Sequence, residues 1–256
     1  MTRKSQFFVL FTIAILSQGL GLAADSNAIT ASPNDVVIAH VAEGGQWSTS
    51  ITLINLSAAP VSYTLRFYSD SGAPLTLPLV GGTPSSLVSG NLNVSGSHII
   101  QTAGLPGATL QGWAQLTASS LIGGFAVFKS HLAGQTDSEA VVPFSSKFDH
   151  RFVLAFDNTN GYVIGGALVN ASAFETVTVV ATMRDEAGAM IGNQSVFTMA
   201  PMSHMAFSFP QQFASTTNKK GTAEFSTTSV NLSGLGLRFS PAGPFTSFHA
   251  LSAPGW

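Results

Sequence analysis

The sequence contains no cysteine and few charged residues, and both absences narrow its possible functions. Without cysteine the chain has no disulfide, no thiolate nucleophile and no cysteine ligand for a metal. Charged residues make up 9% of its 256 positions, against about 25% in typical soluble proteins. The formal net charge of −2 does not favour nucleic acid as a partner. The hydrophobic content of 45% excludes a mainly disordered chain.

A continuous apolar run occurs near the N-terminus, and its pattern is typical of a secretory signal. Two basic residues precede the run at 7–16, and small residues follow it. The run has about half of the roughly 20 residues that span a bilayer. We therefore expect residues 1–24 to be a signal peptide, cleaved after Ala23 or Ala24. The mature chain should be exported without a transmembrane segment, to the periplasm, the cell surface or the extracellular space. Its lack of cysteine favours a bacterial origin.

The rest of the chain contains an internal repeat. Residues 40–70 match the segment 115 positions later, and further blocks match in the same order at offsets of 106 to 110. Collinear matches of this kind indicate duplication. The matched pairs include Leu53 with Leu168, Asn55 with Asn170, Asp70 with Asp185, His98 with His204, Gly112 with Gly221, and Gly124 with Gly234.

Two copies of about 100 residues favour two domains over a solenoid, which needs at least three short repeats. We place the domains at residues 33–136 and 137–250. The segment 137–143 reads as a strand, and the sequence leaves open whether it closes the first copy or bridges to the second.

The local pattern within each copy predicts β-strands. Residues 48–56, 61–68 and 176–183 alternate apolar and polar side chains with a period of two. Residues 112–117 with 123–128, and their counterparts in the second copy, are expected to form hairpins. We predict an all-β protein of two tandem antiparallel β-sandwich domains, Ig-like in architecture. The expected core residues are Leu53, Leu65, Phe67, Trp113, Phe125 and Val127 in the first copy, and Leu168, Val177, Val179, Phe225, Leu235 and Leu237 in the second.

Motifs that carry chemistry are sparse. The six histidines lack metal-ligand spacing, and no nucleophile-elbow serine motif occurs. The 12 acidic residues are scattered, which does not favour a glycosidase pair. His98 and His204 align in the repeat, which we interpret as a strand position that accepts histidine. We therefore expect no enzyme activity and assign no catalytic residue.

One polar loop is a candidate calcium site. Asp157, Asn158 and Asn160 lie within the five residues 157–161 and offer carboxylate and amide oxygens. No other cofactor is indicated. The alternative is an ordinary turn rich in asparagine and glycine, because the loop has a single carboxylate and no counterpart in the first copy.

Two aromatic residues are candidates for ligand binding. Trp47 follows a glycine pair and Tyr162 follows the polar loop, so either ring could lie exposed and stack on a sugar. Packing in a core or between the domains is the alternative reading.

Several segments together resemble uncharacterised secreted tandem β-sandwich repeat proteins of acidobacteria and other soil bacteria. The resemblance rests on residues 112–115, 137–143, 156–161, 168–170, 184–185, 221–226 and 235–239, and covers residues 38–248. It implies secretion and a sandwich fold, and it carries no catalytic residue.

Three functions follow from these observations. The favoured one is a secreted non-catalytic interaction or structural protein of the cell surface or extracellular space, with a protein or glycan partner. The alternative is a carbohydrate-binding module acting in trans. A hydrolase whose site is assembled from distant loops is less favoured.

Overall fold

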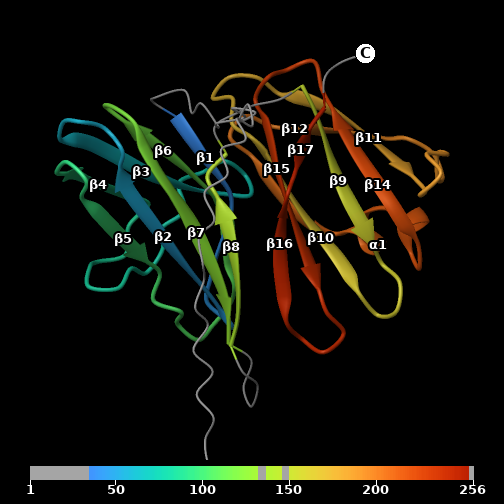
Figure 1. Ribbon diagram of the computed structural model, residues 1–256, viewed down its shortest axis with the longest axis horizontal. Helices are drawn as coiled ribbons and strands as arrows, with labels where there is room; N and C mark the ends of the chain where they lie inside the picture. The colour runs from blue at the N-terminus through green and yellow to red at the C-terminus, as the bar shows by residue number, and fades with distance from the viewer. Residues whose placement is uncertain (1–34, 132–136, 146–149, 254–256) are drawn as a thin grey trace, which may run out of the picture.

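The computed structural model describes residues 35–131, 137–145 and 150–253, and these residues are almost entirely β-structure (Figure 1). The predicted signal peptide lies outside this range. Seventeen strands form four antiparallel sheets among the described residues. The sheets pair into two sandwich-like bodies that lie side by side, which confirms the all-β, two-sandwich prediction. Within these ranges no helix has the length and apolarity needed to cross a membrane.

The first sandwich has two four-stranded sheets. Sheet 1A has the order β1-β6-β3-β4, and sheet 1B has the order β5-β2-β7-β8. The strands are β1 (Asp35–Glu43), β2 (Trp47–Asn55), β3 (Val61–Ser69), β4 (Leu87–Leu92), β5 (Ser97–Gln101), β6 (Leu110–Ala118), β7 (Ile122–Ser130) and β8 (Ser138–Pro143).

The second sandwich repeats this arrangement. Sheet 2A has the order β12-β11-β14-β9-β17, and sheet 2B has the order β13-β10-β15-β16. The elements are β9 (Arg151–Asp157), β10 (Val163–Asn170), β11 (Val177–Arg184), β12 (Ser195–Met199), β13 (His204–Ser208), α1 (Phe209–Gln212), a 3-10 turn (Ala214–Thr216), β14 (Lys220–Ser226), β15 (Leu232–Phe239), β16 (Phe245–His249) and β17 (Leu251–Ser252).

The strand order of the second sandwich repeats that of the first. Strands β9 to β16 occupy the same places in their sheets as β1 to β8, and β17 is an addition beside β9. The alignment shifts in the loop before β11, which is one residue longer than the loop before β3. Asp70 therefore corresponds to Glu186, because Gly72 and Gly188 close equivalent turns. The alignment of Asp70 with Asp185 was wrong by one residue.

The predicted hairpins are also wrong. β6 pairs with β1 and β3 in sheet 1A, whereas β7 pairs with β2 and β8 in sheet 1B. The connection at 119–121 therefore crosses between sheets, and the equivalent connection between β14 and β15 does the same. A short serine-rich loop suits either geometry, so the local sequence does not distinguish a hairpin from a crossing.

A buried asparagine fixes the crossing after the second strand of each copy. The side-chain nitrogen of Asn55 lies 2.8, 3.2 and 2.9 Å from three backbone carbonyl oxygens, and that of Asn170 lies 2.7, 3.2 and 2.9 Å from the equivalent three. Each side-chain oxygen accepts a backbone N–H from the serine two residues later. Buried polar groups require such partners, which explains why this asparagine recurs in both copies.

Most of the predicted core residues are buried, and the exceptions lie on the equivalent strands β7 and β15. Nine of the twelve are less than 9% exposed. Phe125, Val127 and Leu237 are only partly buried. In β7 the side chains that face the core are Ala126 and Phe128, because the alternation of the strand has the opposite phase to the one predicted.

The two sandwiches meet edge to face. The edge formed by β1 and β8 packs on the outer face of sheet 2B, where β1 contacts β10 and β15, and β8 contacts β16. Hydrogen bonds join β8 to β7, so this strand lies in a sheet of the first sandwich. Ala167 and Val169 face the first sandwich, while Leu168 faces the core of the second. Strand β10 is therefore buried on both sides, as central strands are in covered sheets.

Replacing the buried asparagine should destabilise the fold. We expect Asn170→Ala to lower the free energy of unfolding by about 3 kcal/mol, because it leaves buried carbonyls without a donor. The exposed Asn193→Ala is the matched control and should change it by less than about 0.5 kcal/mol. Urea unfolding of both variants measures the difference, and equal losses would contradict the assigned role.

Candidate functional site

The interface between the sandwiches contains a group of three interacting ionisable side chains, His40, His204 and Asp70. It begins at His40, which lies in a β-bulge of β1. The register with β6 shifts between Ile38 and Val41, so one extra residue is accommodated there. Bulges re-aim side chains. Here the imidazole of His40 packs edge-on against Phe128 and stacks on His204 of the second sandwich, with ring centroids 5.4 and 5.1 Å apart.

His204 is held by the first sandwich on three sides. Its Nδ1 lies 2.7 Å from Oδ1 of Asp70, and its Nε2 lies 3.1 Å from Nδ1 of His40. Its backbone N–H donates to the carbonyl of Asp70 at 3.0 Å. Gln111 donates to the other carboxylate oxygen of Asp70 at 2.8 Å. The side chain of His204 has no exposed surface, whereas that of Asp70 is 48% exposed.

The environment favours a neutral His40 beside an ionised Asp70. The pKa of His40 is lowered to about 3, mainly by burial and next by the nearby His204, against a smaller opposing effect of Asp70. Partial burial tends to raise the pKa of Asp70, but hydrogen bonds from His204 and Gln111 outweigh it and leave the pKa below its usual value. With His40 neutral, its Nδ1–H donates to Nε2 of His204, and Nδ1–H of His204 donates to Oδ1 of Asp70.

A turn of the second sandwich closes the cluster. The indole N–H of Trp113 donates to the carbonyl of Met202 at 2.7 Å, and the indole stacks on Tyr68. Trp113 is completely buried, although it lies on the outer face of sheet 1A. Met202 adopts a φ of 58°, a left-handed conformation that is uncommon for a side chain of this size. The turn at 200–203 is therefore shaped by its docking on the first sandwich.

The cluster orients a histidine but supplies no nucleophile. In a hydrolase triad a carboxylate orients a histidine, and the histidine activates a hydroxyl or thiol. Here the position of the nucleophile is taken by His40, itself a base. Among the described residues, no hydroxyl is hydrogen-bonded to either ring. The arrangement is suited to joining two bodies through a chain of hydrogen bonds.

The other histidines lie apart from this cluster. His98 is exposed and bonds to the hydroxyl of Tyr63. His131 is exposed and bonds to Asp137, which also pairs with Lys129 at 2.6 Å. No group of three or more metal-ligating side chains occurs in the described part of the chain.

The predicted equivalence of His98 and His204 is wrong. Leu53 is opposite His98, whereas its counterpart Leu168 is opposite Met205. The residue equivalent to His204 is therefore Ser97. A shift of one position turns a strand side chain to the other face, so His98 lies on the core side of its sheet and His204 lies on the interface side.

The loop with the candidate calcium ligands is held by internal bonds. Oδ1 of Asp157 accepts the backbone N–H and the hydroxyl of Thr159, at 3.1 and 2.6 Å. The buried amide of Asn158 donates to one backbone carbonyl and accepts one backbone N–H. Asn160 adopts a φ of 55°. These residues form a side-chain-capped turn, and the geometry does not favour the calcium prediction.

The candidate ligand-binding aromatics lie apart, Trp47 at the start of β2 in the first sandwich and Tyr162 directly before β10 in the second. Tyr162 is partly buried and lies under the guanidinium of Arg238, whose carbon is 3.6 Å from the ring centroid. Arg238 also lies 3.7 Å from Asp157, so Tyr162 and Asp157 share a partner. Trp47 packs edge-on against Phe245, with centroids 5.4 Å apart, at the interface between the sandwiches. The structure therefore does not combine the two rings into one platform.

Sequence reasoning missed two members of the interface cluster. His40 stands inside the apolar strand 36–42, where a lone polar residue signals a special contact. Asp70 was identified only as a matched position of the internal repeat. Nothing in the sequence connects positions 40, 70 and 204, since the contact depends on how the two sandwiches dock.

Comparison with known proteins gives no match to any protein-family model, curated protein or solved structure. The geometry of the chain itself is therefore the basis for a functional conclusion.

The interface should weaken in acid because of His40. Its pKa in the folded state is about 3, below the unfolded value of 6.5, so the unfolded state binds more protons between these limits. Stability should therefore fall as the pH falls from 6.5 towards 3, and the lowered pKa of Asp70 adds to the loss at the acidic end. We expect His40→Gln to reduce this loss and the exposed His249→Gln to leave it unchanged. Urea midpoints across the window measure the effect, and identical pH profiles for all three proteins would contradict it.

Calcium should leave stability unchanged. The carboxylate of Asp157 is used by Thr159 and faces the cationic Arg238, so a divalent ion would have to displace both partners. We expect the same melting temperature with excess calcium and with chelator. A melting temperature that is higher with calcium, and that no longer depends on calcium in the Asp157→Asn variant, would restore the calcium prediction.

Proposed function

We propose that this protein is an exported, non-catalytic interaction protein of the cell surface or extracellular space. The main support is that the side chains most typical of catalytic or metal sites make hydrogen bonds to other parts of the same molecule. His40, His204 and Asp70 join the two sandwiches, and the polar loop at 157–161 caps a turn. What remains for a partner is a surface of sheets and loops.

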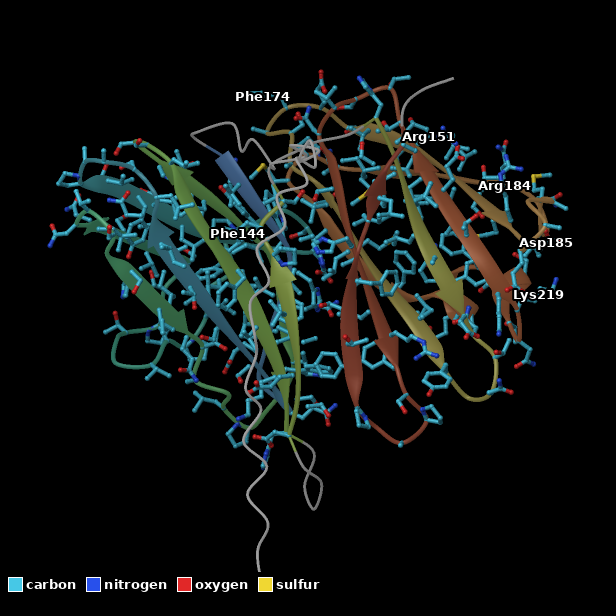
Figure 2. The ribbon with its side chains drawn as sticks, in the orientation of Figure 1. Phe144, Arg151, Phe174, Arg184, Asp185 and Lys219 are labelled. Carbon is cyan, nitrogen blue, oxygen red and sulfur yellow. The ribbon has the colours of Figure 1, made fainter. Side chains whose placement is uncertain are left out.

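The charge distribution also favours surface association. Arg184, Asp185 and Lys219 lie on the side of the second sandwich that faces away from the first (Figure 2). The outer face of sheet 1B has mainly apolar and hydroxyl side chains, with its charges at one end. With so few charges, little electrostatic repulsion opposes contact with a partner.

We also propose that each sandwich is Ig-like. β2 pairs with β5 and β3 pairs with β6, which matches the B–E and C–F pairings of immunoglobulin sheets. The partners of the first and seventh strands are exchanged relative to that pattern, because β1 pairs with β6 and β7 pairs with β2, and β4 pairs with β3 rather than with β5. The likeness is architectural and carries no function.

A glycan-binding function has weaker support. Sugar platforms use exposed Trp or Tyr faces, and Trp47 and Tyr162 are engaged by Phe245 and Arg238. Phe174 is 92% exposed at the top of the second sandwich (Figure 2), but it is a single ring on a loop.

Binding and turnover assays on residues 25–256 distinguish the three functions. We expect saturable binding to surface material of the producing cells, no binding to a polysaccharide panel, and no turnover of esterase, peptidase or glycosidase substrates. Glycan binding that Trp47→Ala abolishes would contradict the proposal in favour of a carbohydrate-binding module. Turnover that a folded His204→Gln variant loses would show a hydrolase.

A further inference from the structure

The outer faces of sheets 1B and 2B are built from equivalent positions. Thr52 pairs with Phe125 in the first copy, and Ala167 pairs with Leu235 in the second. Ile54 corresponds in the same way to Val169. The two faces are thus two copies of one surface within a single chain.

Only the second copy of this surface is covered by the other sandwich. In sheet 2B, Ala167, Val169, Leu235 and Phe245 are less than 9% exposed, because the edge of β1 and β8 packs on them. In sheet 1B, the equivalent face remains open. Ile99 is 60% exposed at one side of this face and Val141 is 54% exposed at the other.

The open face has apolar and uncharged polar side chains across its width. One cross-strand row runs Ile99, Thr52, Phe125 and Pro143, and the next runs Gln101, Ser50, Val127 and Val141. Lys129 and Glu139 form an ion pair at one end, 3.8 Å apart. We call the face made by these positions the 1B face. Exposed large apolar residues such as Ile99 and Val141 on one face are typical of an interaction site.

The 1B face also continues an existing interface. Val141 lies on the strand that packs against β16, and its carbonyl accepts a hydrogen bond from the hydroxyl of Ser247. The contact between sandwiches therefore ends where the 1B face begins.

The edge that covers sheet 2B has no free counterpart in the described chain. The edge of β1 and β8 is already used against sheet 2B. In the second sandwich, β9 is paired with β17 and β16 packs against β8. The 1B face of a second copy is an open surface of the same size, with charges at one end only.

From this we infer that two copies of the protein associate through their 1B faces, sheet against sheet, about a two-fold axis. The inference rests on the proposed function, since it names the chain itself as a partner. Self-complementary two-fold contacts are the commonest form of homo-oligomer, and sheets pack face to face in this way at about 10 Å.

The size of the face indicates a weak dimer. With strands about 4.8 Å apart and about 3.3 Å per residue, a four-stranded face covers roughly 450 Å², and two faces bury roughly 900 Å². Specific interfaces begin near 1,000–1,200 Å². The dimer should therefore dissociate on dilution.

Sedimentation equilibrium of residues 25–256 over a wide concentration range tests the inference. We expect a reversible monomer–dimer equilibrium. Ile99→Lys and Val141→Lys should each weaken it by about 100-fold, because a two-fold axis makes each substitution act twice. Val196→Lys is the matched control, since Val196 is 64% exposed on the edge strand β12. It should leave the dimer unchanged. All three positions are exposed, so an unaltered urea transition confirms folding.

Other outcomes overturn the inference in distinguishable ways. Dimerisation that appears only after residues 25–34 are deleted would assign the face to the chain's own N-terminal segment. A monomer that binds cell-surface protein or glycan in a manner sensitive to Ile99→Lys would exclude self-association and keep the interaction function. A monomer that binds nothing would contradict both proposals. A dimer broken by Val196→Lys and not by Ile99→Lys would place the contact elsewhere.

Discussion

The packing of one sandwich's edge on the other sandwich's face is the constraint on which the rest of this structure depends. It buries β10 on both sides, and it covers β1, which would otherwise be an open sheet edge. Exposed edges are sites of unwanted strand pairing. The equivalent edge of the second sandwich, strand β9, is instead covered by an additional strand, β17. The two repeats have the same fold but unequal surroundings, and this inequality decides which surfaces remain free.

The same contact explains the use of polar side chains. A bulge in β1 directs His40 across the interface, where it meets His204 and Asp70 in a continuous chain of hydrogen bonds. The partly exposed carboxylate lies at the outer end of this chain and the neutral His40 at the inner end. Burying polar groups is favourable only when each finds a partner, and here the partners come from both repeats. The cluster therefore fixes the relative position of the two sandwiches and also stabilises their contact.

Period-two alternation in segments such as 61–68 correctly predicted strands, and the recurrence of Asn55 at Asn170 correctly predicted a duplicated sandwich. The pairing of the strands was not predictable, because the loop at 119–121 is as suitable for crossing between sheets as for a hairpin. The sequence also could not predict that Leu235 is buried while its counterpart Phe125 is partly exposed. Equivalent residues of this kind differ only in whether the other sandwich covers them. The candidate ligands Trp47, Tyr162 and Asp157 were singled out by composition, whereas their environment depends on contacts with Phe245, Thr159 and Arg238.

The same change at two equivalent positions tests the unequal roles of the two faces most directly. Val169 is completely buried against the first sandwich, and its counterpart Ile54 is partly exposed on the open face. We expect Val169→Lys to lower the free energy of unfolding by about 3 kcal/mol or more, because it buries a charge between the sandwiches, and Ile54→Lys to lower it by less than about 1 kcal/mol. Urea unfolding at low protein concentration measures both values. Equal losses at the two positions would contradict the edge-to-face packing.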